Sequence, residues 1–279
     1  MPEAPAPALP FGAESLPAPE GVHCIRLPLA RLEPLLDEAP SALLPDWLAT
    51  AEQEQFARHL LRKRRLEWLG ARLAAKLAWQ ASVRVNTPDQ PAPCPRLAVV
   101  RKSERGRPEL PGHAVSLSHC RSHAMAAVTA AAAAAVMPQP QAKPPLGVDI
   151  ECFAATGAAS LGELIGEHEC ERLGRALGRP PSQARTLLWC LKEALFKALG
   201  DGAFASFAQN LQLQAWRRDV QAPVWHCAPA LSPLGPTLQR CEYRHGWRSD
   251  AAWALVSLGP GATAHLINAR KESWTARPA

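Results

Sequence analysis

The sequence predicts an α+β protein built from two lobes. Its 279 residues suffice for two domains of about 130–140 residues, each able to bury a core. Each half of the chain shows a strand pattern, then a helix pattern, then further strand patterns. A proline-rich segment between the halves is typical of a linker. We therefore expect a disordered Pro/Ala-rich tail over residues 1–20, lobes over 21–136 and 146–261, a linker over 137–145, and a C-terminal tail over 262–279.

The composition favours a soluble globular protein with anionic partners. The chain is 47% hydrophobic and 20% charged, with a net charge of +6 and an isoelectric point near 9.0. A cationic surface attracts a phosphorylated cofactor, nucleic acid or an acidic protein. The chain lacks the block of Lys and Arg that marks a nucleic-acid tail, and Tyr and Phe are scarce for base stacking. Nucleic-acid binding is therefore not expected.

The cysteines and the first residues predict a cytoplasmic protein. The eight cysteines are scattered without a C-x-x-C pair, which disfavours a zinc ribbon and suits reduced thiols. Residues 1–20 lack the basic start and apolar core of a secretory signal. The longest apolar run, residues 124–137, is too short to span a bilayer. We expect no membrane partner.

Hydrophobic periodicity predicts the elements of both halves. The first half should contain a strand over residues 23–27, a short helix within 29–44, two helices over 46–82 with a break near 62–64, and strands over 97–100 and 115–120. The second half should contain a strand over residues 146–151, helices over 161–177 and 187–199, and strands over 212–216, 224–227 and 253–258.

Two short acidic motifs lie in the second half. In the first, Asp149 and Glu151 alternate with apolar residues, so both carboxylates leave one face of a strand. In the second, Glu193 lies on an apolar stripe of a helix that Gly200 ends. An inward carboxylate needs a counter-charge, and two further carboxylates would only repel it. A divalent cation resolves this conflict, and Mg²⁺ binds carboxylates together with phosphate oxygens.

Taken singly, each motif also fits ordinary structure. A D-x-E pair can be a solvated strand edge, and Glu193 and Lys197 can be a surface i,i+4 pair. Their joint occurrence is more specific. The strand G-V-D-I-E of residues 147–151, followed by W-C-L-K-E-A-L-F-K of residues 189–197, resembles the signature of Sfp-type 4′-phosphopantetheinyl transferases.

This resemblance implies a fold. The family has a pseudo-symmetric pair of α+β lobes, each a small antiparallel sheet with packed helices. It also implies a core strand over residues 124–130, although an alanine run intrinsically favours a helix. Because two lobes in one chain would complete the site, we expect a monomer.

The resemblance also implies a reaction. It is the Mg²⁺-dependent transfer of the 4′-phosphopantetheine arm of coenzyme A to a serine of an apo acyl or peptidyl carrier protein, releasing 3′,5′-ADP. Such an enzyme, of the holo-[acyl-carrier-protein] synthase type, serves fatty acid, polyketide or nonribosomal peptide synthesis. Asp149, Glu151 and Glu193 would hold the metal, and Lys192 and Lys197 would bind phosphates. The general base would be Glu193, or Glu169 through a water; the sequence leaves both open.

Three segments of the first half resemble coenzyme A contacts of the same family. They are G-A-R-L-A-A-K at residues 70–76, G-R-P at 106–108 and S-L-S-H at 116–119. Each alone fits a solvated basic helix face, a turn or a structural histidine. The resemblance assigns coenzyme A binding to Arg72, Lys76, Arg107, Pro108, Ser118 and His119.

Two other classes of function remain open. Another Mg²⁺-dependent coenzyme A or nucleotide transferase would use the same three acids. A non-catalytic basic binding module fits the isoelectric point, but such a module has no reason to collect carboxylates beside its lysines.

Overall fold

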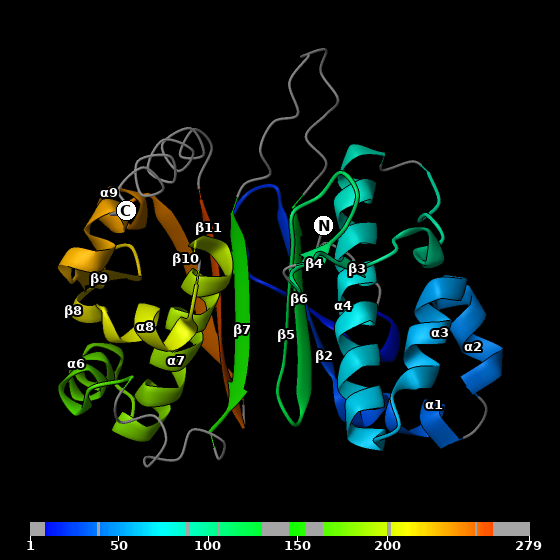
Figure 1. Ribbon diagram of the computed structural model, residues 1–279, viewed down its shortest axis with the longest axis horizontal. Coiled ribbons are helices and arrows are strands. Elements are labelled where there is room, and N and C mark those ends of the chain that lie inside the picture. The colour runs from blue at the N-terminus through cyan, green and yellow to red at the C-terminus, as the bar shows by residue number, and fades with distance from the viewer. Residues whose placement is uncertain are drawn as a thin grey trace, which may run out of the picture. The chain divides into compact units, whose positions relative to one another are not determined.

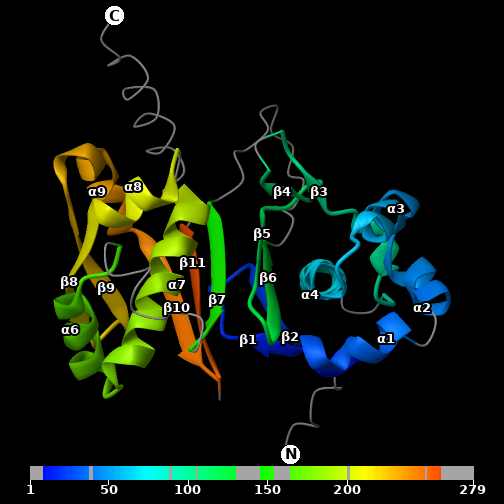
Figure 2. The same cartoon turned by 60° about the horizontal axis from the view of Figure 1, so that its bottom comes forward.

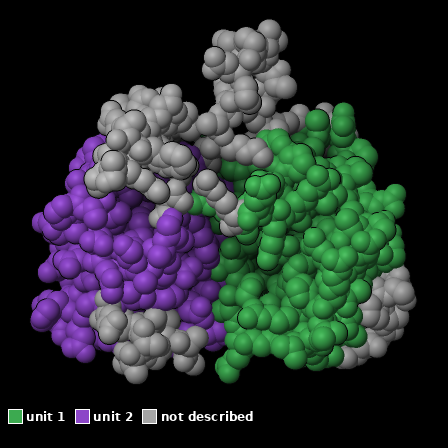
Figure 3. Space-filling view, viewed as in Figure 1, with its two compact units in different colours: residues 1–131 green, residues 132–279 purple. Residues whose placement is uncertain are grey.

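The chain folds into two compact units, residues 1–131 and 132–279, in a computed structural model (Figure 1, Figure 3). The structure describes residues 9–37, 40–87, 90–104, 106–129, 145–153, 164–199, 202–248 and 250–258. The predicted linker up to residue 144 and the predicted tail over residues 262–279 lie outside this part of the chain.

Unit 1 contains a four-stranded antiparallel sheet in the order β1-β2-β6-β5 (Figure 2). The short edge strand β1 lies within the tail that the sequence predicts as disordered, so that expectation is wrong at residues 14–16. An ion pair of 2.6 Å between Glu14 and Arg26 joins β1 to its neighbour. The strands are β1 Glu14–Leu16, β2 Val22–Pro28, β5 Val115–His119 and β6 His123–Thr129.

The alanine-rich segment forms the buried strand β6, as the family resemblance implies. All its residues are buried between β2 and β5, so tertiary packing overrides the helical preference of alanine. The small side chains let a helix approach the sheet closely. A Cβ added at Gly70 would collide with Leu29 and touch Ala124.

The helix that approaches is α4, which packs against β6 and β2. It begins at residue 62, so the predicted break between two helices lies at residues 59–61. Four leucines that share one face of α4 are buried: Leu66, Leu69, Leu73 and Leu77. The helices of unit 1 are α1 Glu33–Asp37, α2 Pro40–Trp47, α3 Thr50–Arg58 and α4 Arg62–Asn86.

The strand predicted over residues 97–100 is wrong. Pro95–Leu97 instead forms a 3₁₀ turn, with Pro95 at its start where a proline suits a helical turn. A small hairpin follows, made of β3 Arg101–Lys102 and β4 Pro108–Glu109.

Unit 2 contains a three-stranded antiparallel sheet in the order β10-β11-β7 and a separate hairpin of β8 and β9. Sequence patterns predict each of these strands except β10, whose residues C-E-Y-R-H-G-W lack a clean alternation. The strands are β7 Leu146–Cys152, β8 Leu211–Arg217, β9 Ala222–Cys227, β10 Cys241–Trp247 and β11 Ala251–Leu258.

Helix α7 packs across β7 and β11 (Figure 2). Gly147 on β7 permits this approach, because a Cβ there would collide with the carbonyl oxygen of Ala194. Gly178, with a φ of 64°, ends α6 in the left-handed region. The predicted start of α6 at residue 161 lies outside the described residues. The helices are α6 Glu167–Leu177, α7 Pro181–Leu199, α8 Phe204–Gln209 and α9 Gly235–Leu238.

The predicted α+β class is confirmed, since each unit is a small antiparallel sheet with one long helix packed on it. Among the described residues, no helix combines the length and the apolar character needed to cross a membrane.

Candidate active site

One face of unit 2 gathers four of the predicted site residues, Asp149, Glu151, Glu193 and Lys197, which we call the acidic face. Asp149 and Glu151 leave β7 on the side that α7 covers, and Glu193 and Lys197 are one turn apart on α7. The Lys197 Nζ lies 2.7 Å from Asp149 Oδ1 and 3.3 Å from Glu193 Oε2. The same ammonium donates to the Val148 carbonyl oxygen at 3.1 Å.

Burial is the largest cause of the raised carboxylate pKa values on the acidic face, and repulsion between the carboxylates adds to it. Burial, with Asp149 and Glu193 nearby, raises the pKa of Glu151 to about 7. Burial and Asp149 likewise raise the pKa of Glu193. Burial alone would lower the pKa of Lys197, but Asp149 and Glu193 outweigh it and raise that pKa. Three carboxylates therefore share one ammonium, which suits a further cation.

Carboxylate oxygens are the ligands that Mg²⁺ prefers, so the donor set of the acidic face fits this ion. The arrangement is not yet a ligand cage. No group of three or more His, Cys, Asp or Glu side chains in the described part of the chain is positioned to hold a metal. Lys197 pairs with both Asp149 and Glu193, where a metal would have to compete for the same oxygens.

Lys192 and Glu169 are not part of the acidic face. Lys192 is only 1% exposed and donates to the carbonyl oxygens of Leu164 at 2.9 Å and Ala208 at 3.1 Å. Its Nζ also lies 3.3 Å from Glu169 Oε1. Adjacent helical residues point about 100° apart, so Lys192 turns away from the side that Glu193 occupies. The predicted phosphate contact of Lys192 therefore finds no support in this geometry.

Glu169 is also engaged inside unit 2. Its Oε1 accepts the Leu213 N–H at 2.6 Å, and its Oε2 accepts the Gly166 N–H at 2.9 Å. The second bond caps the start of α6. With Lys192 as a further partner, both oxygens are occupied, which runs against a catalytic role for Glu169.

In unit 1, cations gather around the indole of Trp68. The Arg72 guanidinium lies 4.1 Å from the ring centroid. The His59 ring centroid lies 5.7 Å from that of Trp68, and burial and then the charges of Arg72, Lys102 and Arg64 lower the pKa of His59. We call Arg64, Arg72 and Lys102, together with His59, whose lowered pKa favours the uncharged ring, the cation cluster.

Arg72 is the buried member of the cluster. It is 5% exposed, and burial lowers its pKa to about 10. In the described part of unit 1, its Nε has no hydrogen-bond partner; the guanidinium stacks on Trp68, and the charge of Glu52 favours its protonated form. A buried cation in this state suits an anionic ligand.

Two of the other predicted coenzyme A contacts, His119 and Pro108, are linked to members of the cluster. His119, at the end of β5, has its Nδ1 4.0 Å from Glu67 Oε2, and Glu67 pairs with Arg64 at 3.2 Å. Pro108 pairs with Lys102 across the β3–β4 hairpin. Ser118 is buried on β5, and the Arg107 side chain is exposed on the hairpin.

The environment of Lys76 contradicts the prediction that this residue binds coenzyme A. It is fully buried and donates to Glu52 Oε2 at 2.8 Å, the Ala98 carbonyl oxygen at 2.6 Å and the Pro95 carbonyl oxygen at 3.2 Å. An ammonium has three protons, so none remains for the predicted coenzyme A contact.

Sequence reasoning missed His59 and Lys102. Both join the cluster through tertiary structure, one from the α3–α4 junction and one from the hairpin. A partial signal was present, because Arg64, Trp68 and Arg72 recur every fourth residue and so share one face of α4.

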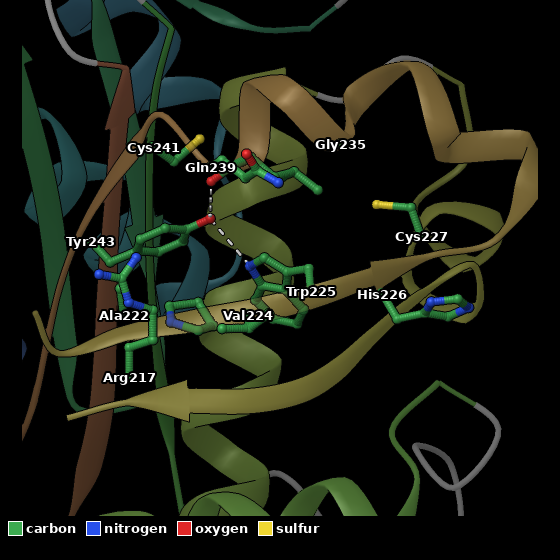
Figure 4. Close-up of a pocket in the computed structure, with 12 residues that line it drawn as sticks. Arg217, Ala222, Val224, Trp225, His226, Cys227, Gly235, Gln239, Cys241 and Tyr243 are labelled. Atoms are coloured by element: carbon green, nitrogen blue, oxygen red, sulfur yellow. Dashed lines mark hydrogen bonds between the residues drawn. The ribbon is translucent and has the colours of Figure 1, made fainter.

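A pocket of about 470 Å³ lies elsewhere in unit 2, between β9, β10 and α9 (Figure 4). Trp225 Nε1 donates to the Tyr243 hydroxyl at 3.1 Å, and that hydroxyl donates to the Leu238 carbonyl oxygen at 3.3 Å. No residue of the acidic face lines this pocket.

Comparison with known proteins supports the sequence resemblance for unit 2. Residues 145–247 match the model of the 4′-phosphopantetheinyl transferase superfamily. The predicted resemblance to this superfamily is thereby confirmed over these residues, while its Sfp-type subdivision stays a prediction. A search of curated proteins finds no match.

Two solved structures are similar to part of the chain. A holo-(acyl-carrier-protein) synthase from Bacillus anthracis str. Ames, in complex with CoA (3′,5′-ADP), is 29% identical. The match covers 39% of this chain and 92% of that chain, with a TM-score of 0.33. A holo-[acyl-carrier-protein] synthase from Neisseria meningitidis is 21% identical over 41% of this chain and 97% of that chain, again with a TM-score of 0.33.

Proposed function

We propose that this chain, whose residues 145–247 match the 4′-phosphopantetheinyl transferase superfamily, transfers the 4′-phosphopantetheine arm of coenzyme A to a serine of apo acyl or peptidyl carrier proteins. The serine oxygen attacks the β-phosphorus, the bond from that phosphorus to the bridging oxygen breaks, and 3′,5′-ADP leaves. The acidic face is the observation that carries the proposal, because it combines three carboxylates with one lysine at the motifs of the matched family.

Asp149, Glu151 and Glu193 are the residues that would hold Mg²⁺. Burial, and to a smaller extent the charges of Asp149 and Glu193, raise the pKa of Glu151 to about 7, and a divalent cation would offset the repulsion among these carboxylates. The ion, when bound, neutralises the diphosphate and polarises it. Lys197, which orients Asp149 through its 2.7 Å contact, is assigned to stabilise charge on the phosphates.

Glu193 is the better candidate for the general base. Its side chain is 25% exposed, so a substrate hydroxyl can reach it. Both carboxylate oxygens of Glu169 instead accept backbone hydrogen bonds, from Leu213 and Gly166, and the carboxylate also pairs with Lys192. The proton of the carrier serine would thus pass to Glu193.

The cation cluster of unit 1 is assigned to the phosphates of coenzyme A. Arg72 supports this because it is a buried cation that stacks on Trp68 and whose Nε has no hydrogen-bond partner in the described part of the unit. His119 is linked to the cluster because its Nδ1 lies 4.0 Å from Glu67 Oε2, and Glu67 pairs with Arg64. Contacts of Arg107, Pro108 and Ser118 with the nucleotide remain predictions, as do a monomeric state and a cytoplasmic location.

The protein partner would be an acidic carrier protein. The net charge of +6 favours association with an acidic partner and speeds their encounter.

A mass measurement tests the proposal. The protein is incubated with coenzyme A, Mg²⁺ and a panel of apo carrier proteins, and the carriers are weighed. We expect a gain of one phosphopantetheine per carrier, which EDTA and Asp149→Ala abolish. No gain on any carrier, with coenzyme A still bound, would favour another transfer from coenzyme A. Salt-sensitive polyanion binding without coenzyme A binding would favour the basic binding module.

A further inference from the structure

A buried ion pair, Glu169–Lys192, joins separate segments of unit 2. Lys192 on α7 donates to the carbonyl oxygens of Leu164, before α6, and Ala208, at the end of α8. Glu169, in the first turn of α6, accepts the N–H of Leu213 on β8. One pair thus ties α7 to the start of α6, to α8 and to β8.

Unit 1 contains the same arrangement. Lys76 on α4 pairs with Glu52 on α3 at 2.8 Å and donates to the carbonyl oxygens of Pro95 and Ala98. Glu52 also accepts the N–H of Val100 at 3.1 Å. We call each pair with its backbone contacts a clamp.

The two clamps match in the position and hydrogen bonds of their glutamates and in the number of carbonyl oxygens that each lysine contacts. Each glutamate is the third residue of its helix and accepts the N–H of the residue before that helix, Ala49 at 3.1 Å and Gly166 at 2.9 Å. In each, the glutamate's other oxygen accepts a downstream N–H, and the lysine on the next long helix donates to two carbonyl oxygens. The recurrence in both units indicates a structural device, because a substrate contact would have no reason to be buried twice.

Burial explains why the clamps must be complete. Lys76 and Lys192 are 0% and 1% exposed, and an unpaired ammonium at such depth is strongly unfavourable. The full set of acceptors therefore fixes each lysine and the helix that bears it. Because Glu193 follows Lys192 directly, holding Lys192 toward α6 and α8 also holds Glu193 at its angle toward β7.

We propose that Glu169 and Lys192 are positioning residues, which hold α7 so that Glu193 and Lys197 face Asp149 and Glu151, and which touch neither coenzyme A nor the reacting atoms. Glu52 and Lys76 play the same part for α4 and its Arg72. The role of this pair in positioning Glu193 and Lys197 for catalysis rests on the proposed function, whereas the structural role of the pair does not.

Stability gives the first test, which needs no activity. Lys192→Met and Glu169→Met each leave one buried charge, so each should lower the Tm by about 10 °C. The double variant should lose no more than the worse single variant, because the pair acts as one unit. Lys63→Met is the matched control. Because the Lys63 side chain is 72% exposed, this substitution should change the Tm by no more than about 1 °C. Unchanged Tm values for both single variants, or fully additive losses, would overturn the clamp.

Ligand contact gives the second test, on the unmodified chain. Side-chain ammonium signals of ¹⁵N-lysine are assigned with Lys192→Arg and Lys197→Arg, and coenzyme A is then added. The Lys192 signal should stay in place while the Lys197 signal shifts. A shift at Lys192 equal to that at Lys197 would overturn its positioning role. If no signal shifts, coenzyme A does not bind and the proposed function fails. The Tm values of the single and double variants still test whether the clamp exists.

Kinetics give the third test, which separates positioning from catalysis at Glu169. Glu169→Gln should lower kcat by about 10- to 100-fold with a lowered Tm, and should keep the acidic limb of the pH–rate profile, because the base lies elsewhere. Loss of that limb at an unchanged Tm would instead make Glu169 the base.

Discussion

At the scale of the residue, one step along α7 separates two roles. Lys192 is enclosed by backbone carbonyl oxygens and Glu169, whereas Glu193 is a quarter exposed on the acidic face. The two neighbours differ because a helix turns each side chain by about 100°. Lys192 is thus assigned to hold the helix in place, and Glu193 is assigned to the reaction.

Arg72 should be the anchor of a coenzyme A phosphate. Arg72→Met keeps the apolar contact with Trp68 but removes the charge, so the Kd for 3′,5′-ADP should rise by about 10- to 100-fold. The Tm should be equal or higher, because burial has already lowered the pKa of Arg72 to about 10 and charge burial costs stability. Calorimetric titration measures the Kd. Arg84→Met, an exposed change on the same helix, is the control, and an equal Kd for both variants would contradict the assignment.

Glu151 should destabilise the metal-free protein at alkaline pH. Its pKa rises from an ordinary 4.5 to about 7 on folding, so the stability it contributes is complete below pH 4.5 and is lost as the pH rises through 7. Glu151→Gln should therefore raise the Tm by about 2–4 °C at pH 8 in EDTA, and by less at pH 5. Added Mg²⁺ should stabilise only the unmodified protein at pH 8. An equal difference at both pH values would contradict this account of the carboxylate.

At the scale of the element, both long helices approach their sheets through glycine. Gly70 on α4 lies against Leu29 and Ala124, and Gly147 on β7 lies under the carbonyl oxygen of Ala194. The second contact matters for the site because it brings α7 close enough for Lys197 to reach Asp149.

Gly147→Ala should separate α7 from β7. The added Cβ would collide with the Ala194 carbonyl group, which belongs to a helix backbone and cannot turn aside. Overpacking of this kind costs about 1–3 kcal/mol, so the Tm should fall by roughly 2–12 °C. Activity should fall further, because Glu193 and Lys197 move with α7. Gly235→Ala is the control, since nothing lies within 4 Å of a Cβ there, and equal effects of both changes would contradict the close approach.

The sequence predicted the elements of this fold better than their contacts. Periodicity and the family resemblance located β7, α7 and even β6, whose alanines favour a helix when taken alone. They also brought Asp149, Glu151 and Glu193 to one face. Motif similarity could not show that Lys76 and Lys192 are buried, because burial depends on carbonyl oxygens supplied by distant segments.

At the scale of the whole molecule, stability should depend on pH through His245. Burial lowers its pKa from 6.5 to about 4, and its ring lies 5.0 Å from that of Trp216 and 5.5 Å from that of Trp247. The unfolded chain therefore takes up a proton near pH 6.5 that the folded chain refuses until about pH 4.

The stability that His245 contributes is thus complete above pH 6.5 and is lost as the pH falls toward 4, by up to about 3 kcal/mol. His245→Phe keeps an aromatic ring and should flatten this loss. Urea denaturation at pH 7.5 and pH 5 measures it. An equally steep loss in the variant would show that other groups set the acid stability.

The most direct test of the account counts both products of one reaction. Coenzyme A, Mg²⁺ and an apo carrier are incubated with the protein, and holo-carrier and 3′,5′-ADP are measured together by mass spectrometry. We predict equal amounts of the two products, none with Asp149→Ala, and a slower yield of both with Lys192→Met. Release of 3′,5′-ADP without holo-carrier, or holo-carrier formation that survives Asp149→Ala, would contradict transfer at the acidic face.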